Sequence, residues 1–168
     1  MKKRGQLFGI PFSMIFSILL IIFFIVAAGI AIKVVWDPWG GCGIAQQAQQ
    51  GQFKDKLQDV VSQVWNSAGS DYPNFKIDLP SGIKSVCFLD YNSAKIGKDA
   101  NLYYNLTKSG EGNLYLNPAK KACKSFRVMK IEHINITKIT EKNNPYCVGN
   151  NKNLTIKMGY MDKLVTIE

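Results

Sequence analysis

The chain has 168 residues, a formal net charge of +9 and 46% hydrophobic residues. This composition is too apolar for a disordered chain. It also excludes a simple soluble globular protein, because residues 5–32 carry no charged side chain. The length suits one domain with one appendage.

An apolar run over residues 7–36 follows the basic residues 2–4. A helix needs roughly 20 apolar residues to cross a bilayer, so we predict a transmembrane helix over 7–36. A cleaved secretory signal, whose apolar core usually has only about 7–15 residues, is the weaker interpretation. Basic flanks stay in the cytoplasm, which predicts a cytoplasmic tail over 1–6 and an extracytoplasmic part over 37–168.

The cysteines lie after the apolar run, at Cys42, Cys87, Cys123 and Cys147. An even number outside the membrane is typical of disulfides in an oxidising compartment. Four cysteines allow three pairings, and the sequence does not choose between them. The small residues before Cys42 are similar to those before the lipid-bearing cysteine of lipoproteins. Trp39 stands where such a signal has an aliphatic residue, so we favour a disulfide.

Three N-glycosylation sequons begin at Asn105, Asn135 and Asn153. Each has the form Asn-x-Thr and permits glycosylation where the machinery exists. Such short motifs arise by chance in an Asn-rich chain. They agree with export and add nothing further.

Residues 44–168 are predicted to form an α+β domain behind a Gly/Pro-rich joint over 37–43. Its first element is an amphipathic helix over 44–68. The apolar residues of this helix recur at steps of three and four, and they are Phe53, Leu57, Val60, Val61, Val64 and Trp65. We expect this helix to pack on one face of a mainly antiparallel sheet.

Seven short apolar runs separated by turn residues predict strands. The runs cover residues 84–89, 102–106, 114–116, 125–131, 134–139, 154–160 and 164–167. The clearest alternation places Leu154, Ile156, Met158 and Tyr160 on one face of a strand. Residues 109–112 predict a hairpin turn, and loops are predicted at 143–145 and 149–151.

The sequence contains no recognisable catalytic or metal-binding constellation. It has no C-x-x-C spacing, and its single histidine, His133, is expected to be an ordinary surface or half-buried residue. One histidine argues against Cys/His catalysis and against a Ser/His/Asp triad. Nothing singles out two of the 12 acidic residues as the pair that an envelope hydrolase would need. We expect no cofactor.

Residues 120–127 carry a basic cluster of Lys120, Lys121, Lys124 and Arg127. Such a cluster could bind anions, nucleic acid or acidic lipid headgroups. We interpret it as a solvated face that leads into a strand. No nucleic-acid partner is expected.

The start of the chain, Lys2-Lys3-Arg4-Gly5-Gln6 before an apolar run, resembles the class III signal of archaeal type IV pilin-like proteins. The resemblance implies that a membrane peptidase cuts between Gly5 and Gln6, and that the apolar helix stays as an anchor below a β-rich head. Two features depart from the family pattern. Ile10 stands where the family usually has glutamate, and Pro38 interrupts the helical stem.

These observations favour a single-pass envelope protein that presents a disulfide-stapled, non-catalytic binding or structural domain outside the cell. Its expected partners are the lipid bilayer and other envelope or pilin-like proteins. The alternative is a pilin-like subunit of a surface filament or secretion apparatus.

Overall fold

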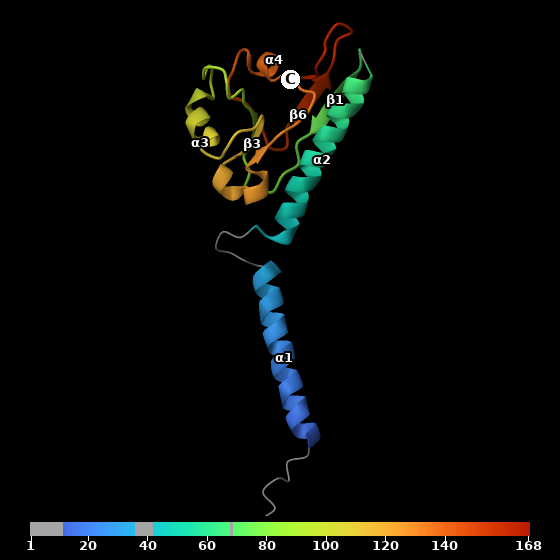
Figure 1. Ribbon diagram of the computed structural model, residues 1–168, viewed down its shortest axis with the longest axis vertical. Helices are drawn as coiled ribbons and strands as arrows, with labels where there is room; N and C mark the ends of the chain where they lie inside the picture. Colours follow the sequence, from blue (N-terminus) through green and yellow to red (C-terminus); the bar gives the residue numbers. More distant parts are fainter. Residues whose placement is uncertain (1–11, 36–41, 68) are drawn as a thin grey trace, which may run out of the picture. The chain divides into compact units, whose positions relative to one another are not determined.

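A computed structural model describes residues 12–35, 42–67 and 69–168 (Figure 1). The chain divides into two compact units, Met1–Trp39 and Gly40–Glu168. We call the second unit the head. The predicted tail, the Gly5-Gln6 junction and most of the joint over 37–43 lie outside the described residues.

The first unit contains helix α1 (Phe12–Val35). Its stretch Met14–Ile32 is long and apolar enough to cross a membrane, and its side chains are exposed within this unit. A helix of this kind near the N-terminus is either a membrane anchor or a signal sequence. Within the predicted range 7–36, a helix is confirmed for the described residues 12–35.

The head begins with helix α2 (Ile44–Asn66), which ends two residues before the predicted boundary. Five residues of the predicted stripe are buried, namely Phe53, Leu57, Val60, Val61 and Val64. The sixth, Trp65, is 38% exposed. The 3.6-residue period that predicted this helix thus also identified the face that it buries.

The strands of the described residues form two antiparallel sheets, which confirms the α+β class. The three-stranded sheet has the order β1 (Asp71–Lys76), β6 (Asn153–Lys157) and β7 (Thr166–Ile167). The four-stranded sheet has the order β4 (Val128–Met129), β3 (Leu114–Asn117), β2 (Ser85–Phe88) and β5 (Tyr146–Gly149).

The main core lies between α2 and the two sheets. Helix α2 lies along β1 and β6, as Figure 1 shows. Successive side chains of a strand point to opposite faces, so β2 directs Val86 and Phe88 into this core. Its Cys87 packs on the other face of the sheet, against Leu106 and Tyr115.

Tyr115 is fully buried, and its hydroxyl is satisfied by the backbone. The hydroxyl donates to the carbonyl oxygens of Gly110 and Gly112, at 2.9 and 3.1 Å, and accepts from the Gly112 amide at 3.0 Å. Desolvation raises the pKa of Tyr115 above its usual value near 10. This tyrosine therefore serves as a core residue.

Two of the predicted strands are wrong because those segments are helical. Residues 102–106 belong mostly to α3 (Tyr103–Thr107), after the 3₁₀ helix η1 (Ala100–Leu102). Residues 134–139 contain the start of α4 (Ile136–Thr140). The Asn135 side chain caps α4 by accepting from the Lys138 amide at 3.1 Å. The turn predicted at 109–112 connects α3 to β3, so it joins no hairpin.

The remaining strand predictions are right in part. Strands β2 and β3 lie where residues 84–89 and 114–116 predicted them. The run 125–131 begins in the 3₁₀ helix η3 (Lys124–Phe126) and keeps only the two residues of β4, and the run 164–167 keeps the two of β7. Strands β1 and β5 were not predicted. Pro73 lies within β1 and Pro145 lies directly before β5, and proline usually interrupts a strand.

Candidate functional site

The structure determines the cysteine pairing that the sequence left open. Cys42 is bonded to Cys123, and Cys87 to Cys147, with no free cysteine among the described residues. The second bond joins β2 to β5, where its two cysteines are register partners. The first bond joins Cys42, two residues before the start of α2, to a cysteine 81 positions later.

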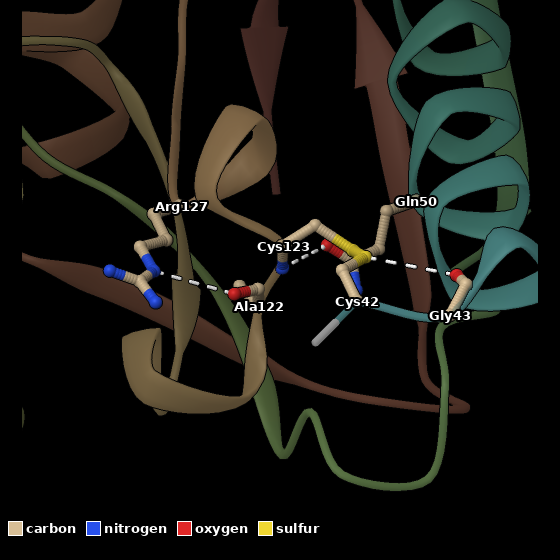
Figure 2. The surroundings of a disulfide bond; sticks show 6 residues. All are labelled: Cys42, Gly43, Gln50, Ala122, Cys123 and Arg127. Atoms are coloured by element: carbon tan, nitrogen blue, oxygen red, sulfur yellow. Dashed lines mark hydrogen bonds between the residues drawn. A yellow bond between two sulfur atoms is a disulfide. The ribbon is translucent and has the colours of Figure 1, made fainter. Parts of the chain in front are cut away.

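The Cys42–Cys123 disulfide ties the residue between two 3₁₀ helices to the start of α2. The two 3₁₀ helices are η2 (Ala119–Lys121) and η3. The Cys123 amide donates to Oε1 of the buried Gln50 at 3.0 Å (Figure 2). A Cβ atom on Gly51 would lie 3.4 Å from the Phe126 ring, so the ring of η3 lies close to the backbone of α2. We call residues 42–51 and 118–127 the base of the head.

The sequence segments of the base contain basic residues and no acidic ones. Lys120, Lys121 and Lys124 are exposed. Arg127 is half-buried, and its Nε donates to the Ala122 carbonyl oxygen at 3.4 Å (Figure 2). None of these four takes part in the ion pairs found among the described residues. The three lysines of the cluster predicted as a solvated face are thus exposed, and no acidic residue of their own segment balances their charge.

The other end of α2 carries an exposed apolar turn. Tyr160 is 85% exposed and Met161 is 98% exposed, the highest values for large apolar side chains of the head. The turn is nevertheless braced by hydrogen bonds. The Asp162 amide donates to the Gly159 carbonyl oxygen at 3.0 Å, and the Gly159 amide donates to Asp162 Oδ2 at 3.1 Å.

Aromatic stacking and one ion pair complete this end. Trp65 and His133 stack with ring centroids 3.7 Å apart, and Trp65 Nε1 donates to the Lys163 carbonyl oxygen at 3.2 Å. Lys138 Nζ lies 3.4 Å from Asp162 Oδ2. We call Trp65, His133 and residues 159–163 the tip. The base and the tip are the two candidate functional surfaces of the head.

The residues singled out from the sequence fall in different places. His133 is half-buried as predicted, and its backbone is left-handed with φ of 65°. Of the sequon residues, Asn105 and Asn153 are exposed, whereas the half-buried Asn135 is the cap of α4. Gly5 and Gln6 are outside the described residues, so nothing structural bears on their cleavage.

Asp90 is the one buried acidic side chain of the described residues, at 7% exposure. Its carboxylate accepts from the Asn92 amide at 3.0 Å and from two hydroxyls, Ser93 Oγ at 2.8 Å and Thr137 Oγ1 at 3.3 Å. These contacts hold the loop after β2 together. Over the ranges that the structure describes, no group of three or more His, Cys, Asp or Glu side chains could hold a metal ion.

The sequence did not predict the tip, because the alternation of apolar residues continues past the end of β6 to Tyr160. Leu154, Ile156 and Met158 are buried, but Tyr160, predicted on the same face, is exposed. The strand ends at Lys157, and Gly159 starts the turn that Asp162 closes. Glycine and aspartate are both common in turns, and they are the signal that the sequence offers there.

No family model matches the chain, and neither a curated protein nor a solved structure matches it.

Proposed function

We propose that this chain is a single-pass membrane protein that displays its head outside the cell as a non-catalytic binding domain. The observation that carries the proposal is the pairing of all four cysteines after α1 into two disulfides. Structural disulfides persist in oxidising compartments and are rare in the cytosol. The basic residues 2–4 support the same orientation, because basic flanks stay inside.

The tip is the surface that we propose for contact with another envelope protein. Exposed tyrosine, tryptophan and methionine side chains are the types that anchor protein interfaces. Here the turn at Gly159 and Asp162 fixes the backbone that carries Tyr160 and Met161, so little conformational entropy is lost on binding. The expected partner offers an apolar pocket for these two side chains.

The orientation is tested on intact cells that express the full chain. A protease and a thiol reagent that cannot cross the membrane are added from outside. We expect the head to be digested, and its four cysteines to react only after reduction and unfolding. A head protected until the cells are opened would contradict the proposal, as would free thiols in the native protein.

The role of the tip is tested with a photo-crosslinking residue in place of Met161, in the full chain and in its native membrane. The matched control carries the same residue at the exposed Lys98, outside both the tip and the base. We expect a discrete adduct from position 161 and none from position 98. Equal adducts from both positions would show collisional contact and would contradict a specific tip.

A subunit of a surface filament or secretion apparatus is the second candidate function. The Gly5-Gln6 sequence before the apolar helix favours it. The mass of the intact chain from its native membrane separates the two candidates. A chain that starts at Gln6 and is recovered in sheared filaments supports the filament subunit, and a chain that keeps its basic tail supports the permanent anchor.

A further inference from the structure

We propose that the base of the head docks on the anionic lipid headgroups of the membrane that holds α1. The proposal rests on the anchoring of the chain proposed above. It deepens that function by assigning a lipid surface to the end of the head that faces away from the tip along α2.

Charge is the first argument. The exposed Lys84 lies next to the base in its backbone, because its amide donates to the Asn117 carbonyl oxygen, just before η2, at 2.8 Å. The Lys121 stem lies over Gly82, where an added Cβ atom would come within 3.5 Å of the lysine Cβ. The segments 42–54, 79–89 and 112–131 all lack acidic residues.

One carboxylate contacts the base, because Asp78 accepts from Gln49 Nε2 at 3.4 Å. Asp78 lies with Lys56 and Lys76 along a shallow groove, so its charge has basic neighbours of its own. The lysines of the base therefore keep an outward positive potential. Each basic residue near an anionic membrane surface contributes about 1 kcal/mol of attraction.

The covalent tether is the second argument. Six residues separate Val35, the last residue of α1, from Cys42. A chain of seven peptide steps extends no more than about 25 Å. Because Cys42 is bonded to Cys123, the same tether also limits the distance between Val35 and Cys123, which lies between the lysines of η2 and η3. Tethering at this length gives the lysines a high effective concentration at the membrane surface, so weak contacts suffice.

An exposed apolar side chain is the third argument. Ile44 opens α2 two residues after Cys42 and is 63% exposed. An apolar residue among lysines suits the boundary between headgroups and acyl chains, where the lysine stems snorkel toward the phosphates. The first turn of α2 also contains no acidic residue, so the positive end of its dipole is not neutralised by the helix itself.

These features favour lipid over single-stranded nucleic acid. Binding to a single strand requires exposed aromatic rings on which the bases stack. The aromatic residue of the base is Phe126, which is half-buried and packs over Gly51. The base thus offers positive charge and an aliphatic side chain without a stacking platform.

The test uses the full chain in lipid nanodiscs of phosphatidylcholine, with or without phosphatidylglycerol. A water-soluble acylating reagent modifies the lysines, and mass spectrometry gives the rate at each site. In the anionic discs we expect Lys84, Lys120, Lys121 and Lys124 to react about fivefold more slowly, the factor that about 1 kcal/mol implies. Lys163 at the tip should react at the same rate in both kinds of disc.

Two variants of equal net charge sharpen the test. The first, Lys120→Gln/Lys121→Gln/Lys124→Gln, should lose the protection of the reporter Lys84. The second, Lys98→Gln/Lys108→Gln/Lys142→Gln, changes exposed lysines elsewhere and should keep it. About 1 M salt should abolish the protection in the unchanged chain, because the Debye length then falls to about 3 Å.

Equal rates in the two kinds of disc would overturn the proposal, and so would an equal loss of protection in both variants. Protection by single-stranded RNA but not by phosphatidylglycerol would reassign the base to nucleic acid. The discs expose both membrane faces, so the result does not depend on the side that the head occupies in the cell. A wrong orientation would instead appear in the protease and thiol experiment on intact cells.

Discussion

The base and the tip lie at the two ends of one helix and are held by different means. The base is closed by the Cys42–Cys123 bond and presents lysines. The tip has no disulfide and presents Tyr160 and Met161 over a turn braced by hydrogen bonds. A helix of 23 residues separates them by about 34 Å. The covalent bond thus stands at the end where the chain enters the head, and the weaker contacts stand at the free end.

The double substitution Cys42→Ser/Cys123→Ser should have the largest effect, and it should loosen the base while leaving the tip unchanged. The bond closes a loop with a sequence separation of 81, so its loss should lower the free energy of unfolding by about 4 kcal/mol. Denaturant titration of the full chain in detergent measures that loss. Hydrogen exchange should accelerate at residues 118–127 and stay unchanged at residues 159–163.

The matched control for that variant is Cys87→Ser/Cys147→Ser. Its sequence separation of 60 predicts a loss of similar size, about 4 kcal/mol. The native exchange of residues 118–127 should not change, because this bond lies between β2 and β5. Equal local loosening of the base in both variants would show that the first disulfide has no local role.

Gln50→Ala tests the polar contact behind the disulfide. The Cys123 amide would lose its acceptor in a site where both residues are buried. An unsatisfied buried donor costs about 1–3 kcal/mol, which the denaturant midpoint reports. The control is Gln52→Ala at an exposed position of the same helix, where the expected change is within about 0.5 kcal/mol. Equal effects would mean that helix propensity, and not the contact, matters.

The sequence predicted long, periodic elements well and short ones poorly. Helix α2 was predicted because six apolar residues kept one period over four turns. Helix α4 has five residues, and its isoleucines and threonines favour strands by composition. The decisive signal was local. Asn135 stands immediately before Ile136 and caps the helix, which propensity alone does not show.

Strand β1 was missed for a different reason. Pro73 removes a backbone donor, and Asn74 adopts φ of 62°. Both are tolerated because β1 is an edge strand whose register shifts between Tyr72 and Phe75. Position at an edge is a property of the whole sheet, so a local pattern cannot reveal it.

Neither candidate surface could be predicted from the sequence, and the reason is the same for both. The sequence allows three cysteine pairings. Only the Cys42–Cys123 bond places the lysines of residues 120–127 beside the start of α2. The alternation predicts Tyr160 on the face of Leu154, Ile156 and Met158, whereas the turn at Gly159 exposes it. Both depend on contacts between segments that are distant in the chain or on the residue at which a strand ends.

Gly69→Ala tests the packing of the Tyr160 ring of the tip against the backbone of Gly69. Gly69 has φ of +79°, and a Cβ atom there would lie 2.5 Å from the Tyr160 ring. The left-handed backbone costs a residue with a side chain about 1 kcal/mol, and the ring must also move. We expect a loss of about 1–2 kcal/mol in the free energy of unfolding, with weaker crosslinking from position 161.

The control combines Gly69→Ala with Tyr160→Ser in a double-mutant cycle. Removal of the ring should recover the part of the loss that comes from the clash and leave the part that comes from backbone strain. Strictly additive losses would show that Tyr160 does not rest on Gly69, and the tip would then lack the support inferred for its aromatic side chain.

Lys138→Ala should have the smallest effect on stability. The side chains of the Lys138–Asp162 pair are 48% and 35% exposed, and ion pairs of this kind contribute about 0–1 kcal/mol. Lys142→Ala is the control for the loss of one exposed charge. The turn should survive, because the hydrogen bonds between Gly159 and Asp162 do not involve the lysine. A loss above about 1 kcal/mol, reversed by a second substitution Asp162→Asn, would mean that charge and not backbone geometry holds the turn. The tip would then be sensitive to salt, as the base is expected to be, and the contrast between the two ends would rest on their exposed side chains alone.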